Sequence, residues 1–144
     1  MFGQDRNQTR RFFVDVRHKT AAGAVLDTLE PLEQLVAQVI EEHPEYHKLL
    51  DNGDLALEQD YLPELGHSNP FLHMGMHIAI HEQLGSDRPS GIRQIWTQLS
   101  HRHGSNHEAE HRMMECLAEM LWQSQRDRLP PDEQAYLEKM QTLL

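Results

Sequence analysis

The stretch NPFLHMGMHIAIHEQL, residues 69–84, decides the fold class of this chain. Asn69 followed by Pro70 is a strong helix start, because Asn caps helix N-termini well and Pro is tolerated at the first helical position. The residues that follow, up to Gly85, are apolar on nearly every side of a helix. A helix that is apolar all round is buried, so we expect this one to lie centrally, with other helices on most of its sides.

Helical patterns continue on both sides of this stretch. Apolar residues at helical spacing predict helices over residues 8–20 and 28–43, from Ile92 to about Gly104, from the N-cap Ser105 to about residue 125, and beyond Pro131 to the end of the chain. Residues 51–68 are typical of a long connection. No segment alternates as a strand does. The sequence therefore predicts an all-α single domain over residues 1–144, a bundle of about five or six helices.

The composition excludes several classes of function. The formal net charge of −10, from 13 Lys and Arg against 23 Asp and Glu, would repel nucleic acid and anionic lipid. No apolar run approaches the roughly 18 residues of a membrane-spanning helix, and the N-terminus lacks the apolar core of a secretory signal. The single cysteine, Cys116, excludes an internal disulfide. We expect a cytoplasmic protein that binds neither nucleic acid nor membrane. The sequence identifies no small-molecule substrate, and it does not exclude a homo-oligomer.

Histidine pairs are the strongest functional signal. The chain has 11 His among 144 residues, for which random placement predicts roughly one pair at spacing four. Spacing four brings two side chains together on one face of a helix. Five such pairs occur: His43/His47, His73/His77, His77/His81, His103/His107 and His107/His111.

These pairs predict a transition-metal site. His73 and His77 stand in the most apolar helix, where each missed hydrogen bond would cost roughly 1–3 kcal/mol. A metal ion shared with His107 and His111 would satisfy them. Zinc is the first expectation, and iron, nickel and copper also accept imidazole ligands. The alternative is a non-catalytic interaction module whose histidines are structural or pH-responsive.

Further ligand candidates surround these four histidines. His43 and His47 are the next choice, although Pro44 interrupts the helix between them. Six converging imidazoles would exceed the needs of one ion and would indicate two ions or roles outside the coordination shell. Glu82 and Glu115 could add carboxylates. The sequence indicates no catalytic residue, and whether the protein is an enzyme stays open.

The segment HEAEH, residues 107–111, also matches the H-E-x-x-H pattern of zinc hydrolases. In that minor alternative Glu108 is the general base. Glu108 also falls three residues after Ser105, where a capping box would engage its carboxylate. A protease would need a strand edge to hold an extended substrate, and the sequence offers none. Cys116, nine residues after His107, faces away from it and is expected to be a buried thiol.

Several blocks resemble a known family. HPEYH (residues 43–47), NPFLHMGMHIAIHEQ (69–83), DRPSGIR (87–93) and HEAEHRMMECLAEMLWQSQR (107–126) are similar to a family of small bacterial proteins catalogued as a domain of unknown function. The likeness runs over nearly the whole chain and implies a full-length member, but no activity or cofactor. A weaker likeness at the level of the fold is to helix-bundle metal proteins of the damage-inducible, thiol-transferase type. This chain departs from those proteins by carrying His pairs on two or three helices.

Overall fold

The computed structural model describes residues 6–61 and 69–144 and confirms the all-α fold, with no strand in these two ranges. Two 3-10 helices, η1 (Leu26–Thr28) and η2 (Pro44–Tyr46), accompany the α-helices. The α-helices of the described ranges are α1 (Arg6–Ala21), α2 (Pro31–Glu41), α3 (His47–Asp51), α4 (Gly53–Glu58), α5 (Pro70–Ser86), α6 (Ile92–His103), α7 (Asn106–Asp127) and α8 (Glu133–Gln141).

The described ranges thus hold eight α-helices, rather more than the five or six predicted, because α3 and α4 are short and carry weak sequence signals. The chain divides into two compact units, which we call the N-terminal unit (Met1–Ile78) and the C-terminal unit (Ala79–Leu144). The prediction of a single domain stays a prediction.

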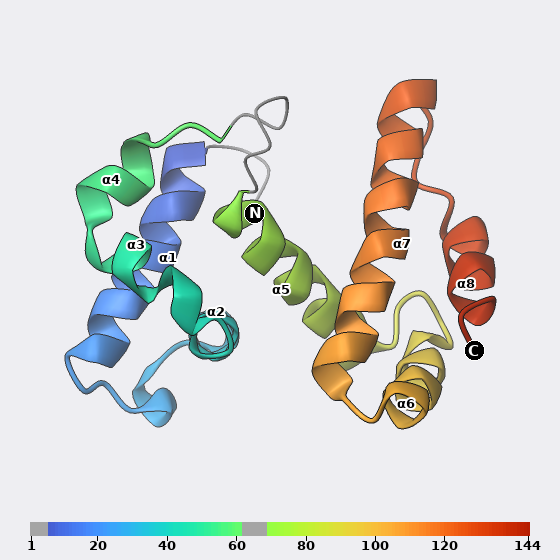
Figure 1. Cartoon of the computed structure of the whole chain (residues 1–144), viewed down its shortest axis with the longest axis horizontal. Coiled ribbons are helices and arrows are strands. Elements are labelled where there is room, and N and C mark those ends of the chain that lie inside the picture. The colour runs from blue at the N-terminus through green and yellow to red at the C-terminus, as the bar shows by residue number, and fades with distance from the viewer. Residues whose placement is uncertain (1–5, 62–68) are drawn as a thin grey trace. The chain divides into compact units, whose positions relative to one another are not determined.

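Helix α1 organises the N-terminal unit, where it packs against α2, α3 and α4 (Figure 1). Its apolar face enters the core, with Phe13 at 0 % and Val16 at 1 % exposure. Phe13 meets Phe71 of α5 edge to face, with ring centres 5.8 Å apart. Further core members come from α2, α3, α4 and α5 and include Val36, Val39, Ile40, Leu50, Ala56, Met74 and Ile78.

Arg10 is a buried charge in this unit, with 4 % of its surface exposed. Its guanidinium donates to the carbonyl oxygens of Ala56 at 3.1 Å and Gln59 at 2.7 Å. These carbonyls end α4, where a helix leaves oxygen acceptors without intrahelical partners and where a positive charge is favourable. The guanidinium also lies 4.9 Å from the ring centre of Phe71. Arg10 therefore ties α1 to the end of α4.

Local capping explains where several helices begin. Helix α2 starts with Pro31 at its first turn, and the Glu30 N–H donates to the Glu33 carboxylate at 3.0 Å. At the start of α5 the Asn69 side chain accepts from the Phe71 N–H at 2.9 Å, as predicted.

The predicted connection over residues 51–68 is wrong in part. Asn52 caps α4 by accepting from the Leu55 N–H at 3.3 Å, and α4 then occupies residues 53–58. Residues 62–68 of that predicted connection, including His67, lie outside the described residues.

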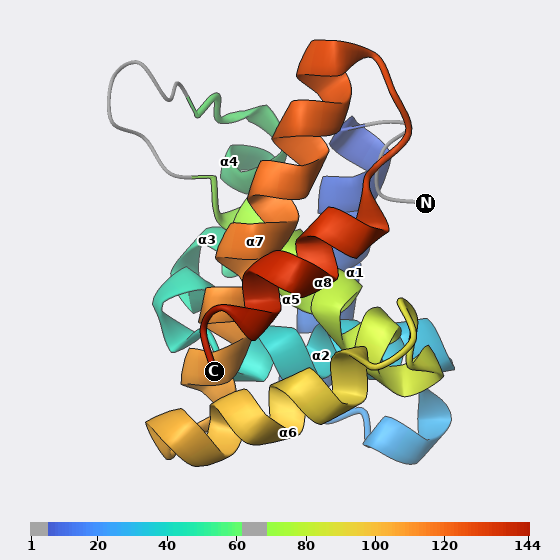
Figure 2. The ribbon, with the colours of Figure 1, turned by 90° about the vertical axis from the view of Figure 1, so that its right-hand side faces the viewer.

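Helix α7 is the longest element of the C-terminal unit and packs against α6 and α8 (Figure 2). The predicted N-cap is confirmed, because the Ser105 hydroxyl accepts from the Glu108 N–H at 3.2 Å. Gly104 ends α6 with a φ of 68°, a conformation that glycine adopts without strain. The core residues of this unit include Ile80, Ile92, Leu99, Met113, Leu117 and Met140.

Helix α5 is less enclosed than predicted. Met74, His77 and Ile78 are 0 % exposed, as expected for a central helix, but Leu72 is 63 % exposed. The sequence pattern thus identified the buried stripe of α5 and overestimated its width. None of the described helices combines the length and apolar character needed to cross a membrane.

Candidate metal centre

Three histidine rings gather in the N-terminal unit, and we call them the three-histidine cluster: His43, His73 and His77. The ring centre of His77 lies 4.7 Å from that of His43 and 4.9 Å from that of His73. The ring centres of His43 and His73 are 5.1 Å apart. His43 is 2 % and His77 0 % exposed, whereas His73 is half-buried. The predicted i, i+4 pair on α5 is therefore joined by a histidine from the end of α2.

Hydrogen bonding fixes which nitrogen of His43 can act as a ligand. Its Nδ1 lies 2.7 Å from the carbonyl oxygen of Val39. A carbonyl only accepts, so Nδ1 carries the proton and the lone pair is on Nε2. A carbonyl on one ring nitrogen is the usual arrangement behind a metal-binding histidine, because it sets the tautomer and the ring orientation. The ring of Tyr46 stacks on His43, with an interplanar angle of 5° and 5.5 Å between centres. Burial raises the pKa of the Tyr46 phenol.

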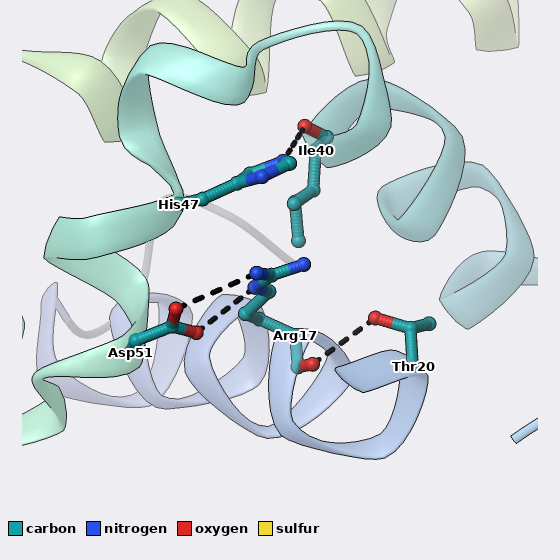
Figure 3. Close-up of polar contacts among 5 residues, drawn as sticks. All are labelled: Arg17, Thr20, Ile40, His47 and Asp51. Atoms are coloured by element: carbon teal, nitrogen blue, oxygen red, sulfur yellow. Dashed lines mark hydrogen bonds and ion pairs between the residues drawn. The ribbon is translucent and has the colours of Figure 1, made fainter. Parts of the chain in front are cut away.

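His47 lies elsewhere in the same unit. Its Nε2 donates to the Ile40 carbonyl at 2.9 Å, which links α3 to the end of α2 (Figure 3). Beside it, Arg17 donates to Asp51 at 2.9 Å and holds the pKa of that carboxyl below its ordinary value. The structure thus brings His43 to the predicted pair on α5 and places His47 in a hydrogen bond with the backbone.

The second predicted pair lies at the start of α7 in the C-terminal unit. The ring centres of His107 and His111 are 4.2 Å apart, and both side chains are half-buried. One ring nitrogen of each lies within 4.8 Å of the other, and the same holds for His43 and His77 in the N-terminal unit. Two imidazole nitrogens on one zinc ion are separated by about 3.3 Å, from bond lengths near 2.0 Å. Each pair is thus close enough to hold a metal ion.

A family model described as Domain of unknown function (DUF1841) matches residues 5–142. The chain belongs to this family. The match confirms the resemblance seen in the HPEYH and NPFLHMGMHIAIHEQ blocks. No curated protein and no solved structure is significantly similar to the chain. Because the DUF1841 family brings no activity with it, the function has to be argued from the side chains.

The C-terminal unit of this DUF1841 member also holds an acid–histidine pair that the sequence reasoning missed. The Glu110 carboxylate lies 2.9 Å from Nε2 of His81, and the Glu110 side chain is 6 % exposed. The helical spacing of the sequence could have predicted that Glu110 is buried. Glu110 occupies the apolar stripe of α7, four residues before Met114 and seven before Leu117. A carboxylate at such a position needs a charged or hydrogen-bonded partner.

The other candidates lie on the surface or are engaged. Glu108, the general base of the zinc-hydrolase alternative, is about half exposed and pairs with Arg112 at 3.3 Å. Its backbone N–H serves the Ser105 cap, but its carboxylate faces Arg112 and not the cap, so only half of the predicted capping box forms. Glu82 and Glu115 are exposed. Cys116 is 3 % exposed, as expected for a buried thiol, and burial raises its pKa.

Proposed function

We propose that this protein binds a transition-metal ion through imidazole nitrogens. The ligands are the three-histidine cluster in the N-terminal unit and His107 and His111 in the C-terminal unit. The observation that carries the proposal is the packing of His43 and His77, both nearly unexposed, with ring centres 4.7 Å apart. Imidazole nitrogens gathered at such depth are donors of the kind that a transition-metal ion accepts.

The chemistry of the donor set supports the metal that the sequence favours. Imidazole nitrogen suits zinc, iron, nickel and copper, whereas magnesium and calcium prefer oxygen. The tautomer of His43 supports the proposal further, because a carbonyl on one ring nitrogen, here Val39 on Nδ1, is the usual arrangement behind a metal-binding histidine. The zinc-hydrolase alternative receives no such support, since Glu108 is about half exposed and paired with Arg112.

Metal content measured by elemental mass spectrometry tests the proposal. The protein is purified without a His tag, and the metal per chain is compared among four proteins. These are the wild type, a His43→Ala, His77→Ala variant, a His107→Ala, His111→Ala variant, and the control His101→Ala. His101 is exposed on α6 and belongs to none of the spaced pairs. We expect the wild type and the control to hold the same metal and each double variant to lose metal.

The stoichiometry also tests the sequence prediction that the two sets bind the same ion, which stays a prediction. If one ion per chain is lost in both double variants, the ion is shared. If two ions are present and each variant loses one, the sets act separately. Wild-type protein that neither contains nor takes up zinc, iron, nickel or copper would refute the proposal. The histidines would then be structural, as His47 with Ile40 and His81 with Glu110 already are. The cytoplasmic location also stays a prediction.

A further inference from the structure

We infer that a metal ion in the three-histidine cluster takes up an anion from solution, so that the natural ligand or substrate of the site carries an anionic donor atom. This inference rests on the proposed metal binding.

The ligands of the cluster are electrically neutral. A metal-binding imidazole is in its neutral form, so a divalent ion held by His43, His73 and His77 keeps its full double charge. The two innermost rings are 2 % and 0 % exposed, so water cannot screen that charge well. A charge removed from water is costly unless an opposite charge accompanies it. The ion keeps this charge whatever number of imidazoles binds it, because each imidazole is neutral.

The described part of the N-terminal unit has no buried carboxylate to neutralise such an ion. Its buried polar or charged residues are Arg10, His43 and His77, and Arg10 adds a further positive charge. The carboxylates that flank His43 in the sequence, Glu42 and Glu45, are exposed. Asp51 is held by Arg17 at 2.9 Å. The described buried side chains of this unit therefore leave the charge of the ion unneutralised.

The buried carboxylate of the C-terminal unit is in contact with a histidine. Glu110 lies 2.9 Å from Nε2 of His81. That contact engages the Glu110 oxygen and reduces what Glu110 can contribute to a metal charge elsewhere.

Coordination number and access both permit an added ligand. Three imidazoles leave at least one position of a four-coordinate zinc or cobalt ion for another donor. His73 and Tyr46, at the edge of the cluster, are half-buried, so part of the cluster is within reach of a small solute. An anionic donor at that position would lower the net charge and complete the coordination at once.

Cobalt(II) serves as the probe, because its visible spectrum reports its ligands and its preferences resemble those of zinc. Cobalt is first titrated into the full-length apoprotein. Azide is then added, followed in separate samples by acetate and its neutral counterpart acetamide. We expect cobalt to bind, azide and acetate to change the visible spectrum saturably, and acetamide to leave it unchanged.

Two variants at one position separate charge from packing. His73→Glu places a carboxylate beside the ion and should weaken azide binding at least about tenfold, because a unit charge within a few ångströms opposes a second anion. His73→Gln removes the same imidazole without adding a charge, so it is the matched control, and azide should bind His73→Gln at least about tenfold more tightly than His73→Glu. Loss of cobalt binding in His73→Glu is not expected, since carboxylates ligate zinc and cobalt.

The outcomes distinguish this inference from the proposed function. If the wild type takes up no cobalt, the proposed metal binding fails and the inference fails with it. If cobalt binds with a spectrum that azide and acetate do not alter, metal binding stands and the anion inference is refuted. Equal azide affinity in His73→Glu and His73→Gln would also overturn it, because the bound anion would then not respond to the charge of the site.

Discussion

Replacing His77 with Ala distinguishes a metal ligand from a packing residue, because the two roles predict different responses to added metal. His77 is 0 % exposed, and its ring centre lies 4.7 Å from that of His43 and 4.9 Å from that of His73. Without metal, the variant loses a buried ring and keeps much of the cavity. Comparable large-to-small core substitutions lower the free energy of unfolding by about 2–4 kcal/mol.

Metal adds a second contribution in the wild type alone. At a free zinc concentration about 100 times the dissociation constant, binding raises the free energy of unfolding by about 2.7 kcal/mol. The variant lacks a ligand, so zinc raises its free energy of unfolding only a little. The difference between wild type and variant should therefore widen from about 2–4 kcal/mol in chelator to about 5–7 kcal/mol in zinc.

Urea unfolding followed by far-UV circular dichroism measures both differences, in chelator and in buffered zinc. The control His101→Ala, at an exposed position of α6, should behave as the wild type does in both buffers. A difference between His77→Ala and the wild type that is the same with and without zinc would refute the reasoning. His77 would then contribute packing alone.

The remaining predictions concern buried polar groups and caps. Arg10→Met leaves carbonyls at the end of α4 without their donor and should lower the free energy of unfolding by about 2–4 kcal/mol in urea titrations, a result that an unchanged midpoint would contradict. Glu110→Ala should lower the free energy of unfolding by about 2–4 kcal/mol in the same assay. A more stable variant would mean that the desolvation of this buried carboxylate outweighs its attraction to His81. Ser105→Ala should lower thermal stability by about 1 kcal/mol and Ser105→Gly by only a few tenths, so equal losses would argue against capping. Burial raises the pKa of both Cys116 and Tyr136. The contribution of each protonated side chain to the free energy of unfolding is therefore fully present below its unfolded pKa and is lost as the pH rises. Stability should fall above about pH 8.5, where unfolded thiols begin to ionise, and a Cys116→Ala, Tyr136→Phe variant should show a shallower fall in urea titrations at stepped pH.

The long helices could be predicted because their signals are local. Asn69 and Ser105 each accept from a backbone N–H within the first turn that follows, and the apolar stripes of α5 and α7 recur at helical spacing. The short helices α3 and α4 could not be predicted in the same way. A helix of five or six residues is too short to be stable alone, so it forms only where tertiary contacts support it. The bond from Arg10 to the end of α4 is such a contact.

The candidate site was predictable to the extent that it depends on helix geometry. Spacing four explains why His73 meets His77 and why His107 meets His111. The arrival of His43 beside the α5 pair depends on how the chain turns at Pro44, and no spacing rule gives that turn. The same applies to His47, whose Nε2 donates to the Ile40 carbonyl seven residues earlier. The partner of Glu110 is His81, 29 positions earlier in the sequence.

The hydrogen bonds of Arg10 impose an order of events while the chain is being synthesised. Their acceptors, Ala56 and Gln59, lie 46 and 49 residues later in the sequence. At a synthesis rate of about 5–20 residues per second, a ribosome needs about 2–10 seconds to supply them. Through that interval the guanidinium stays hydrated, and α1 lacks its contacts with α4. The apolar face of α1 is therefore incompletely covered until α4 has been synthesised. A chaperone that binds nascent apolar segments would meet α1 during this interval.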